Sequence, residues 1–124
     1  MATGLPWVRI DSDIAQNPKV LDLVAEHGQR GMAAAFMFVC SIGYSAAHNT
    51  DGSIRKAALA SIHGTAALAR LLVEVGLWEQ AEKGWNVANY AEHQPTVATR
   101  EAIEKARSEA GRRAANARWG NDGA

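Results

Sequence analysis

The sequence predicts a mainly α-helical protein with a small β-hairpin. A chain of 124 residues with 48% hydrophobic content is long enough for one core and too short for two domains of comparable size. An uncharged apolar run covers Gly31 to Ala47, and two short tryptophan-containing segments flank the tight turn at 82–84. We therefore expect one globular domain over residues 1–95, followed by a basic helical tail rich in alanine and arginine over residues 96–124.

The first elements are a short extended segment and an amphipathic helix. Leu5 to Ile10 is expected to be extended, because Pro6 restricts it to a sheet edge or a lead-in. Asp11, Ser12 and Asp13 offer N-cap oxygens, with Gln16 at capping-box spacing from Asp13. The helix that follows Asn17-Pro18 carries an apolar stripe and should end at Gly28. The stripe consists of Val20, Leu21, Val24 and Ala25.

The helix expected over Gly31 to Ala47 is apolar on nearly all sides, so most of its surface must be covered. It is either the central pillar of a small bundle, or one face contacts another subunit through alanines and glycines. A membrane span is disfavoured, because such a span needs about 17 to 25 residues and this run is short and contains polar side chains. Cys40, the single cysteine, is expected to be a small buried hydrophobe and indicates a reducing compartment.

Two short helices joined by a turn are predicted next. After the turn at 49–52 and an extended Ser53-Ile54, helices are expected over Arg55 to His63 and Thr65 to Val75, with Gly76 ending the second. In the second helix the inward residues should be Ala67, Leu68, Leu71, Leu72 and Val75. The outward residues should be Thr65, Ala66, Ala69, Arg70, Val73 and Glu74.

A hairpin completes the domain. Leu77 to Gln80 and Trp85 to Ala88 should pair across the turn, with Trp78 facing Trp85. We expect these two tryptophans, and Trp7, to pack in the core. The order helix, strand, helix, turn, helix, hairpin predicts a winged helix-turn-helix with an additional N-terminal helix and a C-terminal helical tail.

The tail differs from the rest of the chain in charge. Residues 100–124 hold six basic and four acidic residues, net +2, and the other seven basic and nine acidic residues leave −2 for residues 1–99. We expect residues 89–94 to be irregular, and Thr96 or Thr99 to cap a helix of about twenty residues that is ordered beyond Arg112 only by a partner. Trp119, in a basic and polar context, is a candidate anchor for a partner surface or a base stack.

The residue patterns of known catalytic sites are missing from the sequence. It has no phosphate-binding glycine loop, no H-E-x-x-H, no paired cysteines and no G-x-S-x-G. The four histidines lie near predicted element ends, which disfavours a shared metal site. We expect a protein that is not an enzyme and that uses no cofactor and no metal.

Nucleic-acid binding is favoured by the arrangement more than by the total charge, which is formally zero. In a helix-turn-helix the second helix enters the major groove, which would place Thr65 and Arg70 toward the bases. The other basic residues suit phosphate contacts, which give affinity without reading sequence. They are Arg55, Lys56, Lys83, Arg112, Arg113 and Arg118. The alternative for Arg55, Lys56 and Lys83 is a solvated rim.

Several segments together resemble a known family. They are Trp7 to Asp11, Asn17 to Val20, Thr50 to Ile54, Leu71 to Trp78, Gly84-Trp85, Tyr90 to Pro95 and Ala114 to Gly120. With them the sequence resembles the small winged-helix proteins of actinobacterial phages and mobile elements. These are similar to the N-terminal domains of phage replication-initiation and replisome-organizer proteins.

The resemblance implies a cytoplasmic protein that binds double-stranded DNA and organises replication or transcription. The few charges on the outer face of the second helix favour binding through the DNA backbone. The rival interpretation is a host-takeover or regulatory protein that binds a host protein through its winged helix and its tail, with Trp119 as an anchor. A homodimer formed through Gly31 to Ala47 is a third interpretation.

Overall fold

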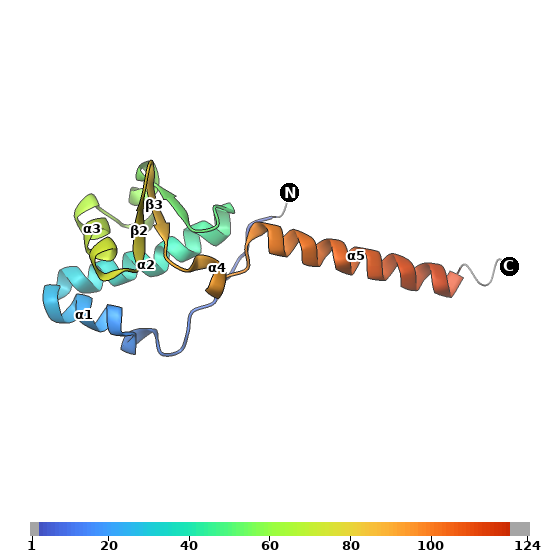
Figure 1. The fold of residues 1–124 in the computed structure, drawn as a ribbon, viewed down its shortest axis with the longest axis horizontal. Coiled ribbons are helices and arrows are strands. Elements are labelled where there is room, and N and C mark those ends of the chain that lie inside the picture. The colour runs from blue at the N-terminus through green and yellow to red at the C-terminus, as the bar shows by residue number, and fades with distance from the viewer. Residues whose placement is uncertain (1–2, 120–124) are drawn as a thin grey trace.

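The computed structural model of the protein describes residues 3–119, and it is helix-rich with a small three-stranded antiparallel sheet (Figure 1). The elements in chain order are η1 (Ile14–Gln16), α1 (Pro18–His27), α2 (Gln29–His48), β1 (Ser53–Arg55), η2 (Lys56–Ile62), α3 (Ala66–Val75), β2 (Trp78–Ala81), β3 (Gly84–Val87), α4 (Tyr90–His93) and α5 (Val97–Trp119). The η elements are 3₁₀ helices.

Helices α1 and α2 form a hairpin whose start and close packing follow from local sequence. The Asn17 side chain accepts a hydrogen bond from the Lys19 backbone N–H at 2.9 Å, and proline stands in the first turn of α1. Gly28, with φ of 58°, joins the two helices. Gly31 permits their close approach, because a Cβ atom there would lie 2.0 Å from the Leu23 carbonyl oxygen.

The segment before α1 differs from the prediction. Residues 5–10 are not paired with any strand of the sheet, and Trp7 is 62% exposed, so its expected core role is wrong. Asp13 precedes the 3₁₀ turn η1 without a side-chain capping bond. Instead, hydrogen bonds to distant elements hold the segment. The Leu5 N–H donates to the Ala46 carbonyl oxygen, and the Arg9 N–H donates to the Gln94 side chain.

Helix α2 is the central pillar on one face, and the other face is uncovered in the first half of the helix. Its buried face packs against α1, η2, α3 and the sheet. That face carries Ala34, Met37, Phe38, Ser41, Ile42, Ser45 and Ala46. On the opposite face Met32 is 53% and Phe36 is 59% exposed. By length and composition alone α2 would also qualify as a membrane span, but core helices of soluble proteins satisfy the same criteria.

The two short helices predicted after the β1 segment are present, with two differences. The first, η2, is a 3₁₀ helix rather than an α-helix, and it meets α3 at a bend of 95° across the three residues 63–65. In α3, the predicted inward residues Leu71 and Leu72 are buried and Leu68 is partly buried. Ala69, predicted to face outward, is fully buried, because the covered face of α3 is wider than the apolar stripe indicated.

The sheet has the strand order β1-β3-β2, with both neighbouring pairs antiparallel. The hairpin β2-β3 is confirmed, and β1 adds a third strand to it. Trp78 and Trp85 are both buried and their ring centroids lie 5.5 Å apart. In the register Trp78 pairs with Val87, so the two indoles meet diagonally rather than directly across the hairpin.

The segment after the sheet forms the short helix α4, not the irregular stretch that was expected. The Thr96 hydroxyl accepts a hydrogen bond from the Thr99 N–H at 3.1 Å, which identifies Thr96 as the cap of α5. Helix α5 then projects away from the body (Figure 1), and every residue from Glu101 to Trp119 is exposed. The expected loss of order beyond Arg112 is therefore not seen up to Trp119.

Candidate nucleic-acid interface

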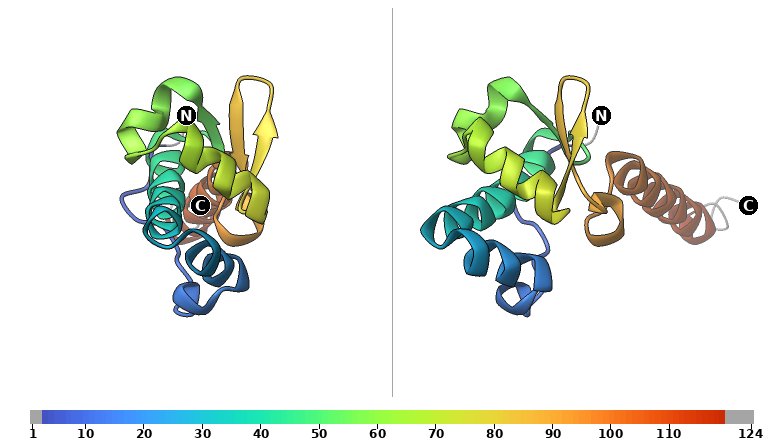
Figure 2. Two further views of the ribbon diagram at one scale, coloured as in Figure 1. Left: turned by 90° about the vertical axis from the view of Figure 1, so that its left-hand side faces the viewer. Right: turned by 60° about the vertical axis from the view of Figure 1, so that its left-hand side comes forward.

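Three of the predicted basic residues are gathered at one end of the sheet. Arg55, the last residue of β1, pairs in register with Gly84, the first residue of β3. Lys83 immediately precedes Gly84 in the turn, and Lys56 follows Arg55 at the start of η2. All three side chains are exposed. This end of the sheet lies beside η2, as both views in Figure 2 show. We call Arg55, Lys56 and Lys83 the sheet-end cluster.

Helix α3 carries one exposed cation, Arg70. Its exposed residues Ala66, Arg70 and Glu74 follow one another at intervals of four, which places them along a single outward stripe. The Thr65 hydroxyl accepts a hydrogen bond from the Leu68 N–H at 3.2 Å, so it caps α3 as well as being exposed. The outward face therefore combines one arginine with one glutamate, as the sequence indicated.

The tail arginines are not brought to the same place. Arg112, Arg113 and Arg118 are exposed on α5, which leaves the body on the side away from α3 (Figure 1). Trp119, at the end of the described chain, is 69% exposed. The eight predicted DNA-binding residues thus divide into the sheet-end cluster, the pair Thr65 and Arg70 at α3, and a third group on α5.

The attachment of α5 is confined to its first turn. The Val97 N–H donates to a carboxylate oxygen of Asp51 at 2.9 Å. The Arg100 guanidinium donates to the Thr3 carbonyl oxygen at 2.8 Å and to the Asn49 side chain. An acidic side chain at a helix N-terminus is favourable, because the N–H groups there carry partial positive charge. These bonds determine where α5 begins, and they leave the arginines beyond Arg100 clear of the body.

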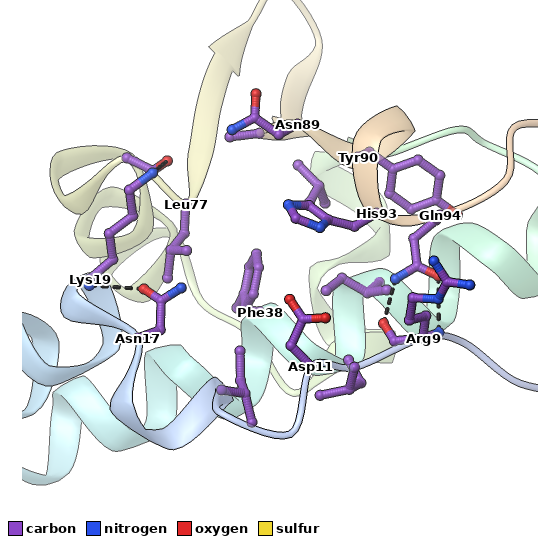
Figure 3. A pocket seen from close by; sticks show the side chains of 16 residues that line it. Arg9, Asp11, Asn17, Lys19, Phe38, Leu77, Asn89, Tyr90, His93 and Gln94 are labelled. Carbon is purple, nitrogen blue, oxygen red and sulfur yellow. Dashed lines mark hydrogen bonds between the residues drawn. The ribbon is translucent and has the colours of Figure 1, made fainter.

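A cavity of about 150 Å³, which no sequence pattern predicted, lies between the N-terminal segment and the β3-α4 connection (Figure 3). Phe38, Ile42 and Leu77 supply apolar lining, while Asp11 and His93 face the cavity from opposite walls. Its lining comes from residues 9–19, 38–42, 76–77 and 87–94. No local motif marks the cavity, because these segments meet only in the folded chain.

Polar contacts hold the walls of this cavity. Gln94 is buried, and its amide both accepts from the Arg9 N–H at 3.0 Å and donates to the Arg9 carbonyl oxygen. The Lys19 ammonium donates to the Gly76 carbonyl oxygen at 3.1 Å, where a cation satisfies the C-terminal end of α3. These hydrogen bonds join the N-terminal segment to Gln94, and they join α1 to the end of α3.

Among residues 3–119 two groups have shifted pKa values, and neither belongs to the basic clusters. Burial raises the pKa of the Tyr90 phenol, although a hydrogen bond with Ser45 acts in the opposite direction. Burial also raises the pKa of the Cys40 thiol, which was predicted to be buried and is partly buried against the core. Among residues 3–119 no three His, Cys, Asp or Glu side chains are grouped so that they could hold a metal ion.

Comparison of the chain with protein-family models, with curated proteins and with solved structures gives no match. The proposal of a function therefore depends on the geometry of the chain and on the chemistry of its surface.

Proposed function

We propose that the protein is a winged helix-turn-helix that binds double-stranded DNA mainly through the phosphate backbone. It would act in organising replication or transcription, in the cytoplasm of a bacterial host if the gene belongs to a phage. The observation that carries the proposal is the sheet-end cluster: exposed Arg55 pairs in register with Gly84, next to exposed Lys83 in the hairpin turn, and exposed Lys56 follows Arg55.

The arrangement of the elements supports the winged-helix part of the proposal. Helices η2 and α3 meet at 95° across a three-residue turn, within the geometry of DNA-binding helix-turn-helix motifs. Strand β1 precedes this pair, and the β2-β3 hairpin follows it as a wing. Pairing of β1 with β3 joins the hairpin to the strand that precedes the two helices, as a wing requires.

The side chains favour backbone contacts over base reading. A bidentate contact between an arginine and a guanine contributes about 1–3 kcal/mol of discrimination, and α3 offers only Arg70 for such a contact. Four phosphate contacts, by the sheet-end cluster and Arg70, would give a slope of log affinity against log salt of about −3.6. Affinity would then fall roughly 150-fold between 50 and 200 mM salt. DNA sequence would matter little.

Fluorescence anisotropy with labelled duplexes of unrelated sequence, titrated at several salt concentrations, tests the proposal. The double variant Arg55→Gln/Lys83→Gln should lower the affinity and reduce the salt slope by about 1.8, because each lost phosphate contact removes about 0.9. Arg30→Gln is the matched control, since Arg30 is exposed on α2 and outside the proposed surface. Undetectable binding at low salt would refute the proposal, as would unchanged affinity in Arg70→Ala/Lys83→Ala.

A second candidate function is the binding of a host protein by a regulatory protein. The projecting α5 favours it, because Trp119 and Ile103 are 69% and 50% exposed on a helix whose residues beyond Arg100 all face solvent. The formal net charge of zero also favours it. Pull-down from lysate with and without nuclease separates the two functions. A partner that survives nuclease and is lost on deletion of residues 112–124 supports this second function.

A further inference from the structure

The cavity between the N-terminal segment and the β3-α4 connection has an apolar floor and a polar mouth. Its floor includes the buried side chains of Phe38, Ile42 and Leu77. Most of the exposed residues on its lining are polar, and these are Arg9, Asp11, Asn89 and His93. A concave apolar surface with a few polar groups at fixed places is the usual form of a site for a small molecule.

The volume of the cavity limits the size of its ligand. At about 150 Å³ the cavity is as large as an apolar cavity that holds one benzene molecule. It therefore accommodates a single six-membered ring with a small substituent. Such a ring would be buried against Phe38 and Leu77, which Figure 3 shows at the floor of the cavity, and burial of apolar surface favours binding.

Two polar side chains face this ring position without partners of their own. The Asp11 carboxylate belongs to the N-terminal segment and the His93 imidazole belongs to α4, and they lie on opposite walls (Figure 3). Within the part of the chain that the structure describes, neither side chain takes part in a hydrogen bond or an ion pair. The Asp11 carboxylate can therefore accept a hydrogen bond from a ligand.

Asn17 supplies a donor next to this acceptor. Its Oδ1 atom accepts the Lys19 backbone N–H at 2.9 Å, which fixes the orientation of the amide and leaves the NH₂ group to donate. In Figure 3 this group is turned toward the cavity. The lining thus presents an acceptor and a donor to one ligand, which calls for a ligand with a donor and an acceptor of its own.

The charges on the lining select a neutral ligand. Arg9 and Lys19 line the same cavity as Asp11, so a cation meets like charges there and an anion meets the carboxylate. We propose that the cavity binds a small neutral heteroaromatic ring with an amino group, of the aminopyrimidine type. Its amino group donates to Asp11, and a ring nitrogen accepts from the Asn17 amide.

This site is separate from the proposed DNA surface. Leu77 directly precedes β2 and Ala88 directly follows β3, so the cavity lies at the opposite end of the hairpin from the turn that carries Lys83. A ligand in the cavity leaves the sheet-end cluster open, and the inference does not depend on DNA binding. Because the ligand contacts both the N-terminal segment and the base of the hairpin, binding should also stabilise the folded chain.

Titration of the full chain with 2-aminopyrimidine, followed by two-dimensional proton-nitrogen NMR, measures the binding. For a ligand of about seven non-hydrogen atoms the Kd should be on the order of 1 mM. The backbone amide signals of Asp11, Asn17, Leu77 and His93 should shift with ligand concentration. At ten times the Kd the ligand should raise Tm by about 5 °C in scanning calorimetry.

Two variants remove the polar contacts without disturbing the fold. Asp11→Ala deletes the acceptor, and Asn17→Asp keeps the oxygen that caps α1 but loses the NH₂ donor. Each should raise the Kd at least about 5-fold. Asp13→Ala is the matched control, because Asp13 is exposed, makes no side-chain capping bond and lies outside the lining. Pyrimidine, which lacks the amino group, should also bind at least about 5-fold more weakly.

Three results would overturn the proposal. One is the absence of any shift in the lining amides at about 20 mM 2-aminopyrimidine, far above the expected Kd. Another is an equal Kd in Asp11→Ala, Asn17→Asp and Asp13→Ala, which would place the ligand elsewhere. The third is binding of pyrimidine, benzoate or benzamidine as tight as that of 2-aminopyrimidine. A protein that binds DNA but not this ligand would leave the proposed function intact, so the two ideas fail separately.

Discussion

Substitution of Gly31 by alanine tests how closely α1 and α2 pack. A Cβ atom at this position would lie 2.0 Å from the carbonyl oxygen and 2.5 Å from the carbonyl carbon of Leu23. Restoring an ordinary contact distance requires a displacement of more than 1 Å, and both atoms belong to the backbone. The helices must therefore separate, because no side chain can rotate out of the way.

The change in the free energy of unfolding caused by Gly31→Ala follows from two opposing effects. Overpacking of this kind costs about 1–3 kcal/mol or more, whereas replacing glycine by alanine inside a helix stabilises it by up to about 1 kcal/mol. Leu23, 1% exposed, would lose packing when α1 moves. We expect a net loss of about 2 kcal/mol, which lowers Tm by about 8 °C in a domain of this size.

Gly43→Ala is the matched control, because it changes the same residue type in the same helix where nothing lies within 4 Å. It should raise the free energy of unfolding by about 0.5 to 1 kcal/mol. Urea and thermal unfolding followed by tryptophan fluorescence measure both variants. Equal effects of the two substitutions would show that α1 does not approach α2 closely at Gly31, and would refute the steric reasoning.

Three further predictions concern polar contacts. Ser41→Ala removes the acceptor of the Trp78 indole N–H, a buried hydrogen bond of 3.2 Å, and should cost about 1–3 kcal/mol in urea unfolding. Combining it with Trp78→Phe should cost less than the sum of the two single changes, and strict additivity would argue against the bond. Because burial raises the pKa of Tyr90 in the folded state, the unfolded chain loses this proton first, so stability should fall as pH rises above about 10. Tyr90→Phe should flatten this alkaline limb in thermal melts, and an unchanged slope would contradict the assignment. Arg100→Met removes the bonds to Thr3 and Asn49 and should increase amide hydrogen exchange in the first turn of α5, while unchanged exchange there would show that these bonds do not hold the helix.

Local signals in the sequence were sufficient for most of the elements. Helices α1, α3 and α5 each start at a side-chain oxygen, supplied by Asn17, Thr65 and Thr96. Helices α1 and α3 end at Gly28 and Gly76. These boundaries therefore depend only on neighbouring residues. The hairpin β2-β3 likewise follows from two short apolar segments and the turn between them. Such features can be read from a single sequence because the interactions that create them span few residues.

Errors appeared where distant contacts decide the outcome. Trp7 is apolar yet exposed, because the segment that carries it crosses the outside of α2 and is held by Ala46 and Gln94. Ala69 is buried because the elements around α3 cover more of it than its own pattern indicates. Burial at these two positions depends on which other segment arrives, and periodicity carries no information about that.

Most of the element order, the caps at Asn17, Thr65 and Thr96, the hairpin turn and the basic residue types follow from the amino-acid sequence alone. Which of these residues lie together follows from the folded chain. Pairing of β1 with β3 brings Arg55 beside Lys83 across nearly thirty residues of chain, while α5 carries Arg112, Arg113 and Arg118 away from them. Proximity of this kind comes from strand register and helix packing, which are long-range interactions, whereas capping and propensity act within a few residues.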